Sequence, residues 1–240
     1  MRFIGESPEL KEPLWRYFKT DRLIEFLRTG ELYFSSARQF QDKFEGAVAV
    51  LPPRYQEDIR YVKPDRIDKA FEKLRRLTKV SCWHRASHES DAMWQLYANK
   101  WQGVAIQTSF DKIKNSVQPF KLDPKYEAEE LWAGNVAYVD LIKERLEVSM
   151  MERFWYKHMP FEWEHEFRLA ISLRMAEEFG VPVPEHGIKV RFDIANLIEH
   201  IHLGPFISDE EIENVRAVAS EYGLGDRIEI SSLKGSPRYT

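Results

Sequence analysis

The sequence predicts an α+β fold, with a mixed sheet and flanking helices in one compact domain covering residues 1–240. Two observations support this class. Short apolar segments typical of strands are mixed with helical patterns, without the strict alternation of a doubly wound sheet. The chain has 240 residues, of which 43% are hydrophobic and 13% aromatic, so it can build a sizeable core.

The segment 14–36 has the pattern of a strand-helix-strand unit. Trp15–Phe18 is a short strand candidate, and Thr20 is a suitable cap for the amphipathic helix that follows. Gly30 stands where a left-handed residue ends a helix. Leu32–Phe34 then forms the second strand.

The middle of the chain mixes both kinds of element. The stretch 52–79 is charged, poor in aromatic residues and helical after Pro64, so we expect a peripheral helical insertion. The segment 90–99 reads as a largely buried helix, because Met93, Trp94, Leu96 and Tyr97 cover most of its circumference. Further strands are expected at 80–83, 103–108, 135–139 and 163–173, and a further helix at 141–159.

The C-terminal part is expected to add three strands, at 188–192, 201–203 and 227–230. A helix should begin after Ser208, where Ser208 and Glu211 have the spacing of a capping box. We expect Trp83, Trp94, Ile106 and Phe167 to be buried together in one core, since each lies in an apolar stretch of a predicted element.

Composition limits the function classes. The net charge is -4, which disfavours bulk nucleic-acid binding but leaves room for a local basic patch. Cys82 is the single cysteine, so no intramolecular disulfide forms and a reducing compartment is expected. The segment 1–12 lacks the apolar core of a signal peptide, and no apolar run is long enough to span a membrane. The sequence therefore predicts a soluble cytoplasmic protein.

The segment 164–168 carries a row of charges. On a strand, Glu164, Glu166 and Arg168 share one face, while Trp163 and Phe167 point to the core. One interpretation is a solvated face on which Arg168 pairs with a carboxylate. The other is the floor of a cleft, where the like charge of one carboxylate raises the pKa of its neighbour and suits it to general-base or cation-stabilising work.

The first strand contains Arg16 and Tyr17. A buried arginine needs an anionic partner. This partner is either a carboxylate such as Glu45 or Glu166, in a structural ion pair, or a phosphate or carboxylate of a ligand.

Cysteine and histidine signals are weaker. Cys82 together with His84 suggests a nucleophilic thiol. Strand alternation and apolar surroundings instead favour an inert buried thiol. The histidine pairs, His84 with His88 and His200 with His202, lack the ligand spacing of a recognised metal site, so no metal is expected. No glycine-rich dinucleotide motif or phosphate-binding loop is present.

The chain resembles the bacterial family called domain of unknown function 2971 from about residue 14 to 233. The matching segments are Trp15–Tyr17, Gly30–Ser35, Phe40–Gly46, Cys82–His84, Ser90–Tyr97, Gly103–Gln107, Glu164-x-Glu166-x-Arg168, His202–Pro205 and Ile228–Leu233. One departure is Gln41-Asp42-Lys43, where the family reads Asn-Asp-Pro; Asp42 is kept, but the turn is less constrained. The family carries no assigned reaction.

The layout is also similar to that of ADP-ribosyltransferases, which implies an NAD-using enzyme in defence or stress response. By this resemblance Arg16 holds the NAD pyrophosphate, and Glu166, with Glu164 as the second carboxylate, stabilises the oxocarbenium-like transition state. Aromatic residues such as Tyr33 or Phe44 stack on nicotinamide. NAD is thus the expected substrate, and no other cofactor is implied. The expected ligand-binding residues are Arg16, Tyr17, Tyr33, Ser35, Asp42, Phe44, Glu45 and Arg168.

A second hypothesis is a non-catalytic regulatory module that holds a partner, a small molecule or a nucleotide at 42–45 and 164–168. A hydrolase of nucleic acid is disfavoured by the charge balance. The enzyme hypothesis predicts that Arg16, Asp42, Glu45 and Glu166 surround one concave pocket. The oligomeric state is not predicted.

Overall fold

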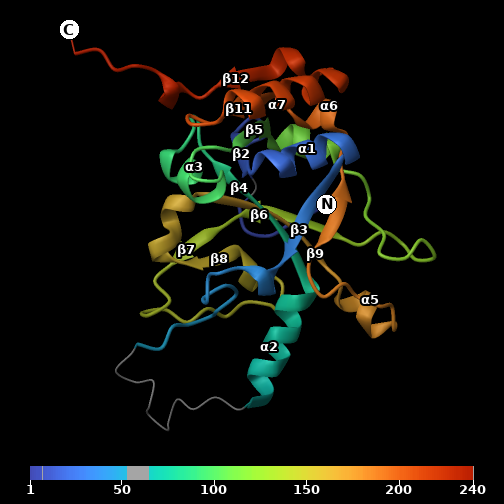
Figure 1. The fold of residues 1–240 in the computed structure, drawn as a ribbon. Helices are drawn as coiled ribbons and strands as arrows, with labels where there is room; N and C mark the ends of the chain where they lie inside the picture. The colour runs from blue at the N-terminus through green and yellow to red at the C-terminus, as the bar shows by residue number, and fades with distance from the viewer. Residues whose placement is uncertain (7, 53–64, 240) are drawn as a thin grey trace. The chain divides into compact units, whose positions relative to one another are not determined.

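The computed structural model describes residues 1–6, 8–52 and 65–239 (Figure 1). The chain groups into two compact units. The first consists of residues 1–7, 33–82 and 119–189, and the second of residues 8–32, 83–118 and 190–240. Each unit therefore combines segments that are distant in sequence.

The first unit is built on strands in the order β1-β6-β9-β4. β1 runs parallel to β6, and β6 runs antiparallel to β9, with Gly134 opposite Arg168. A separate two-stranded parallel sheet joins β7 and β8. The strands with residues in this unit are β1 (Arg2–Phe3), β3 (Glu31–Ser36), β4 (Thr78–Arg85), β6 (Leu131–Asn135), β7 (Ala137–Val139), β8 (Tyr156–His158), β9 (Glu166–Ser172) and β10 (Ile188–Arg191).

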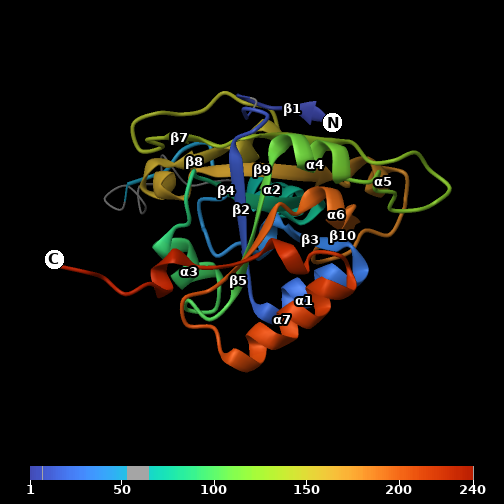
Figure 2. The same cartoon turned by 90° about the horizontal axis from the view of Figure 1, so that it is seen from above.

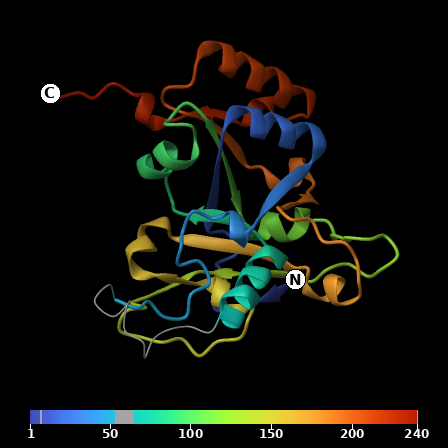
Figure 3. The same ribbon diagram turned by 60° about the horizontal axis from the view of Figure 1, so that its bottom comes forward.

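Its helices are mostly short. They are the α-helices α2 (Asp65–Leu77) and α5 (Arg174–Glu178) and the 3-10 helices η1 (Ala37–Gln39), η4 (Glu152–Trp155) and η5 (Met159–Glu164). Helix α2 packs against η1 (Figure 3). The core of the unit is apolar and contains Ile4, Ala37, Val80, Phe154, Trp155 and Ala170. Leu74 of α2 packs against this core, so the helix is attached through an apolar side chain.

The second unit has strands in the order β2-β5-β11-β12, and β2 also pairs with the last residues of β4. β2 and β11 both run antiparallel to β5, whereas β12 runs parallel to β11. The sheet is therefore mixed. The strands are β2 (Pro13–Phe18), β5 (Val104–Ser109), β11 (His200–Leu203) and β12 (Ile228–Ile230).

Helices α1 and α7 lie side by side in this unit (Figures 1 and 2). The core includes Trp15, Tyr17, Met93, Trp94, Ala98 and Ala105. The helices of the unit are α1 (Thr20–Thr29), α3 (Asp91–Tyr97), α4 (Phe110–Ser116), α6 (Ile194–Leu197), α7 (Asp209–Glu221), η6 (Gly225–Arg227) and η7 (Ser232–Lys234).

The predicted strand-helix-strand unit at 14–36 is confirmed. Helix α1 buries Leu23, Ile24, Phe26 and Leu27 on one face and ends at Gly30, whose φ of 68° is the left-handed conformation that glycine adopts without strain. Thr20 is the first helical residue rather than the cap, because Lys19 takes the cap position. Ser208 caps α7, as predicted, by accepting a bond from the Glu211 N–H.

The expected helix at 141–159 is wrong. The segment contains η4 and β8, and its backbone donors are used elsewhere: the Leu146 N–H donates to the carbonyl of Val48 at 2.8 Å. Trp155 is buried and its indole donates to the carbonyl of Gly134 at 3.1 Å. Tertiary contacts of this segment therefore override its helical pattern.

The expected strand at 163–173 begins later than predicted. Residues Met159–Glu164 form η5, which has Pro160 in its first turn and is followed by His165 with a φ of 39°. Glu164 is therefore not on a strand, and Trp163, which we expected in the core, is 40% exposed. Glu166, Arg168 and Phe167 do follow the predicted alternation along β9.

Three further predictions need correction or qualification. Helix α3 buries Met93 and Trp94 but leaves Leu96 and Tyr97 exposed, so it is not largely buried. The segment 135–139 is divided between β6 and β7, which belong to different sheets. Residues 53–64 of the expected insertion lie outside the described residues, and α2 confirms the helix predicted after Pro64.

The α+β class with a mixed sheet and flanking helices is confirmed. Trp83, Trp94, Ile106 and Phe167 are each buried, but their burial together in one core stays a prediction, because Phe167 belongs to the first unit and the other three to the second. The boundary of one domain over 1–240 stays a prediction, because contacts divide the chain into two units. Among the described residues, no helix has both the length and the apolar character needed to cross a membrane.

Candidate functional site

Five charged side chains meet in the interior of the first unit. Each is buried: Glu166 is 4% exposed, Glu164 is 7% exposed and Arg168 is fully buried. The five residues are Glu45, Lys157, Glu164, Glu166 and Arg168. Buried charges are expensive unless paired, so their concentration marks this cluster as the candidate site.

Arg168 is the centre of the cluster. Its Nη1 and Nη2 donate to the two carboxylate oxygens of Glu45 at 2.6 and 3.0 Å, and its Nε and Nη2 donate to the two oxygens of Glu166, each at 2.9 Å. Nη1 also donates to the carbonyl of Phe154 at 2.5 Å. Two-point pairing of this kind fixes both carboxylates in orientation as well as in charge.

The position of Glu45 depends on the turn after it. Gly46 has a φ of 73°, and a Cβ there would lie 3.0 Å from the rings of Phe71 and Phe154. Only glycine accepts both the conformation and the close contact without strain. The loop therefore turns directly after Glu45 and leaves its side chain against Arg168.

Lys157 connects the second carboxylate to the cluster. Its Nζ donates to Glu164 and lies 3.5 Å from Glu166 Oε2, and it stands 5.0 Å from the centre of the Phe161 ring. The sequence analysis did not select Lys157, because it placed this residue on a helix. In the structure it is the central residue of strand β8 and is buried.

The two glutamates next to Lys157 have opposite pKa shifts. Burial acts to raise the pKa of Glu166, but the charges of Arg168 and Lys157, with hydrogen bonds from Arg168 and Cys82, lower it to about 2. Burial and the charge of Glu166 raise the pKa of Glu164, and Lys157 only partly offsets them. The charge of Glu166 thus acts on the pKa of Glu164 in the expected direction, and burial is the larger cause.

The cluster holds three carboxylates and two cations, Lys157 and Arg168. When Glu164 is ionised, one negative charge is therefore in excess; when Glu164 is protonated, the cluster is neutral. Since Glu166 stays ionised at neutral pH, the proton on Glu164 determines the net charge. Carboxylate pairs whose pKa values are pushed apart in this way are typical of acid–base sites.

Cys82 lies beside this cluster. Its thiol donates a hydrogen bond to Glu166, and burial together with the charge of Glu166 raises its pKa well above the ordinary value. A thiol with a raised pKa is protonated at neutral pH and is a poor nucleophile. The prediction of an inert thiol is therefore favoured by the structure.

The other predicted ligand residues of this unit have structural contacts. Asp42 accepts a bond from the Phe44 N–H at 2.8 Å, which closes the turn before Glu45, and Phe44 packs edge-on against His158 at 5.6 Å. The Tyr33 hydroxyl donates to Gln39 and accepts from the Gly187 N–H. Ser35 pairs with Val80 between β3 and β4. Ligand-binding roles for Tyr33, Ser35, Asp42 and Phe44 stay predictions.

Arg16 and Tyr17 belong to the second unit. The Arg16 guanidinium lies 5.6 Å from the ring centres of both Phe18 and Trp83. Tyr17 is buried, and its hydroxyl accepts from the Ser90 N–H at 3.0 Å, which gives it a role in packing. The expected pairing of Arg16 with a carboxylate and the expected pocket around Arg16, Asp42, Glu45 and Glu166 stay predictions.

An exposed apolar rim lies between Lys157 and Glu164 in the sequence. Met159 and Trp163 of η5 are exposed and Phe161 is half-buried, so the helix that ends at Glu164 presents apolar side chains to solvent. Trp163 stands next to Glu164 in the chain.

The histidine pair at 200 and 202 has carboxylate and amide partners. His200 Nδ1 lies 2.8 Å from Glu229, and His202 Nε2 lies 3.2 Å from Gln107 Oε1. Within the described residues, no group of three or more histidine, cysteine, aspartate or glutamate side chains has the arrangement of a metal site.

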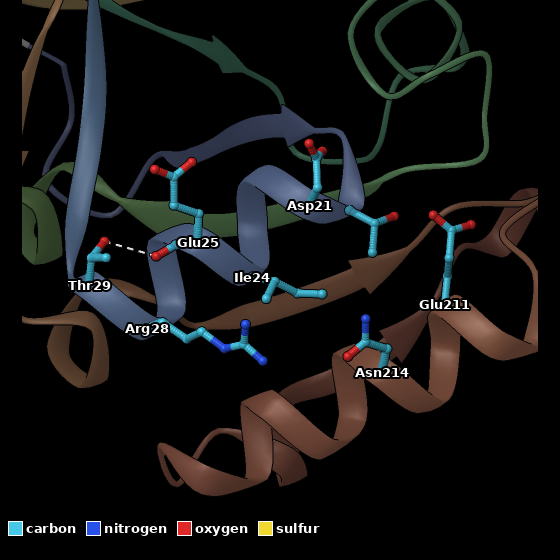
Figure 4. A pocket seen from close by; sticks show the side chains of 8 residues that line it. Asp21, Ile24, Glu25, Arg28, Thr29, Glu211 and Asn214 are labelled. Carbon is cyan, nitrogen blue, oxygen red and sulfur yellow. Dashed lines mark hydrogen bonds between the residues drawn. The ribbon is translucent and has the colours of Figure 1, made fainter.

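A hollow of about 510 Å³ lies between α1 and α7 in the second unit. Arg28, Ile24 and Asn214 point toward the space between the helices, whereas Glu25 points away from α7 (Figure 4). The lining carries both charge signs, and Asp21, Arg28, Thr29 and Asn214 in it are exposed. It is therefore a weaker candidate than the charged cluster.

No protein-family model matches the chain, and no curated protein matches it significantly. Among solved structures, the chain is similar to DarT from Thermus sp. 2.9. The complex with carba-NAD+ gives a TM-score of 0.38 at 12% identity, covering 95% of this chain and 98% of that one. The complex with NAD+ gives 0.37 at 11%, covering 94% and 96%, and the complex with ADP-ribosylated ssDNA gives 0.37 at 10%, covering 95% and 96%.

Proposed function

We propose that the chain is an NAD-using ADP-ribosyltransferase whose first unit carries out the chemistry at Glu164 and Glu166. The observation that carries this proposal is the pair of buried glutamates with opposite pKa shifts, in a cluster with one carboxylate in excess. A buried excess negative charge stabilises a developing cation, which is what cleavage of a nicotinamide–ribose bond produces.

In the proposed step, the bond between the ribose C1′ and the nicotinamide nitrogen breaks, and its electron pair leaves with nicotinamide. The positive charge then developing on the ribose is stabilised by Glu166, which Arg168 keeps oriented and ionised. Glu164, in its ionised form, accepts the proton of the acceptor as the acceptor forms the new bond to C1′. The products are nicotinamide, the ADP-ribosylated acceptor and a proton.

The rim on η5 supports binding of a planar group. Trp163 is exposed, and aromatic faces stack on planar heterocycles. We propose that Trp163 contacts the nicotinamide or adenine ring of NAD. Trp163, which adjoins Glu164 in the chain, takes this role in place of the residues Tyr33 and Phe44 expected from the sequence.

The experiment is nicotinamide release from NAD, measured with and without cell extract as the source of acceptor. E166Q and E164Q should each abolish release while leaving the fold intact, because glutamine has nearly the same size as glutamate and no charge. E162Q is the matched control, since Glu162 lies on the same 3-10 helix but is exposed. Full activity of E166Q would remove the basis of the proposal.

One observation favours the second function, a non-catalytic binding module. All three nitrogens of Arg168 are engaged by Glu45, Glu166 and Phe154, so the cluster also satisfies itself without any ligand. An ion network of this kind can have a purely structural role, in which it fixes the fold around a binding surface. NAD binding by calorimetry without nicotinamide release under either condition would identify this function.

A further inference from the structure

The position of Lys157 in the cluster affects the ionisation of the two glutamates. Lys157 Nζ lies between the two glutamates, donating to Glu164 and standing 3.5 Å from Glu166. Lys157 is buried, so solvent does not screen its charge effectively. Burial acts to lower its pKa, but the charges of Glu166 and Glu164 outweigh burial and the pKa is raised. Lys157 is therefore a permanent cation at neutral pH.

Each element around Lys157 contributes a titratable or charged group. Glu164 comes from η5 and Glu166 and Arg168 from β9. The thiol of Cys82 on β4 donates a hydrogen bond to Glu166. The hydroxyl of Tyr138 on β7 accepts a hydrogen bond from the Glu166 N–H at 2.8 Å. The set is completed by Glu45, which is held by Arg168.

Within this set, Arg168 and Lys157 have different tasks. Arg168 binds Glu45 and Glu166 through two hydrogen bonds each, whereas Lys157 donates to Glu164. Without a cation between them, Glu164 and Glu166 would be two like charges in a buried space, and one of them would retain a proton.

We propose that Lys157 is the positioning residue of this site: its ammonium holds the Glu164 carboxylate beside Glu166 and sets the pH above which Glu164 is ionised. The inference rests on the proposed function for its catalytic meaning, since ionised Glu164 is the form that accepts the proton of the acceptor. The ionisation of Glu164 itself can be measured without any reaction.

The first test follows the carboxyl titration of Glu164 by NMR in protein labelled with ¹³C at the glutamate carboxyl carbon, with E164Q used for assignment. In K157M the midpoint of Glu164 should rise by about 1 to 3 pH units, since a close opposite charge contributes a shift of that size. K157R should keep the midpoint near that of the wild type. An unchanged midpoint in folded K157M overturns the inference.

A second measurement does not require a Lys157 variant to fold. In protein labelled with ¹⁵N at lysine Nζ, the Lys157 titration should move to lower pH in E164Q, because the carboxylate that favours the charged ammonium is gone. K143M is the control. It identifies the signal of Lys143, an exposed lysine paired with Asp140, and it should leave the Lys157 titration unchanged. A Lys157 titration identical in E164Q and wild type also overturns the inference.

The pH profile of nicotinamide release connects the inference to activity. The acid limb of the profile should move to higher pH in K157M and return toward the wild-type position in K157R. A protein with no release at all contradicts the proposed function, and the two NMR titrations then still decide the role of Lys157. Release with an acid limb that is the same in K157M and wild type contradicts the inference alone.

Discussion

The guanidinium of Arg168 and the carboxylate of Glu45 form a two-point ion pair, with Nη1–Oε1 at 2.6 Å and Nη2–Oε2 at 3.0 Å. Both side chains are almost fully buried. The pair joins the loop that carries Glu45 to strand β9. It also holds in place the Arg168 guanidinium, which orients Glu166. The stability of the first unit and the orientation of Glu166 therefore depend on the same guanidinium.

Replacing Arg168 with methionine should destabilise the protein by about 3–5 kcal/mol, because Glu45 and Glu166 are left as buried carboxylates without their cation. The measurement is urea unfolding followed by tryptophan fluorescence. R174M is the control, since the Arg174–Glu178 pair is exposed, and it should change stability by about 1 kcal/mol or less. Equal effects of the two variants would contradict the assigned role of Arg168.

The E166Q variant should be less sensitive to acid than the wild type. The pKa of Glu166 falls from 4.5 to about 2 in the folded protein, so the unfolded chain binds the proton more readily. The stability that Glu166 contributes is present above pH 4.5 and is lost as the pH falls from there toward 2.

The measurement for this prediction is urea unfolding at a series of pH values from 7 downward. The slope of stability against pH below 4.5 should be smaller in E166Q than in the wild type. E178Q, which changes an exposed glutamate, should keep the wild-type slope. Identical slopes in E166Q and wild type would show that Glu166 is not the group that titrates.

The predicted elements that hold are those with local causes. Gly30 ends α1 because only glycine takes that conformation without strain, and the apolar spacing of α1 is visible in any window of the sequence. Glu166 and Arg168 were predicted on one strand face, and their bond follows from the spacing of alternate residues.

The parts that sequence analysis missed have distant causes. Nothing in the local pattern of 141–159 indicates that Leu146 bonds to Val48, so Lys157 was placed on a helix and not considered. The exposure of Trp163 follows from η5, which has Pro160 in its first turn, whereas its apolar neighbours favoured a buried strand. The partner choice of Glu45 depends on Arg168, 123 residues away.

Replacing Trp163 with alanine should raise the KM for NAD by ~2- to 10-fold and leave kcat unchanged, since a lost aromatic contact is worth about 0.5–1.5 kcal/mol. Stability should change by no more than about 0.5 kcal/mol, because the side chain is exposed. The control is F179A, which removes a 68% exposed aromatic side chain of the same unit. A KM equal to that of the wild type would exclude Trp163 from the substrate site.

Glu89 should hold residues 231–233 in place within the second unit. Its carboxylate accepts bonds from the Trp94 indole at 2.7 Å, the Ser231 hydroxyl at 2.6 Å and the Ser232 N–H at 2.7 Å. Burial acts to raise the pKa of Glu89, but hydrogen bonds from Ser231, Ser232 and Trp94 outweigh it and lower the pKa.

Changing Glu89 to glutamine replaces one acceptor oxygen with a donor. This should lower the free energy of unfolding by about 1–3 kcal/mol. Hydrogen exchange at residues 231–233 should become faster, while β11 keeps its protection. E210Q, at the exposed start of α7, is the control and should leave exchange unchanged. Unaltered protection at 231–233 in E89Q would show that other contacts hold the segment.

The separation of Glu45 and Arg168 also determines when the first unit can become stable during synthesis. At about 5–20 residues per second, a ribosome needs roughly 6–25 s to make the 123 residues between them. During that interval the nascent chain contains Glu45 but not the guanidinium that neutralises it, and strand β9 does not yet exist. A chain interrupted before residue 168 therefore cannot complete the interior of this unit, and it should be removed by cellular proteases rather than accumulate as a folded fragment.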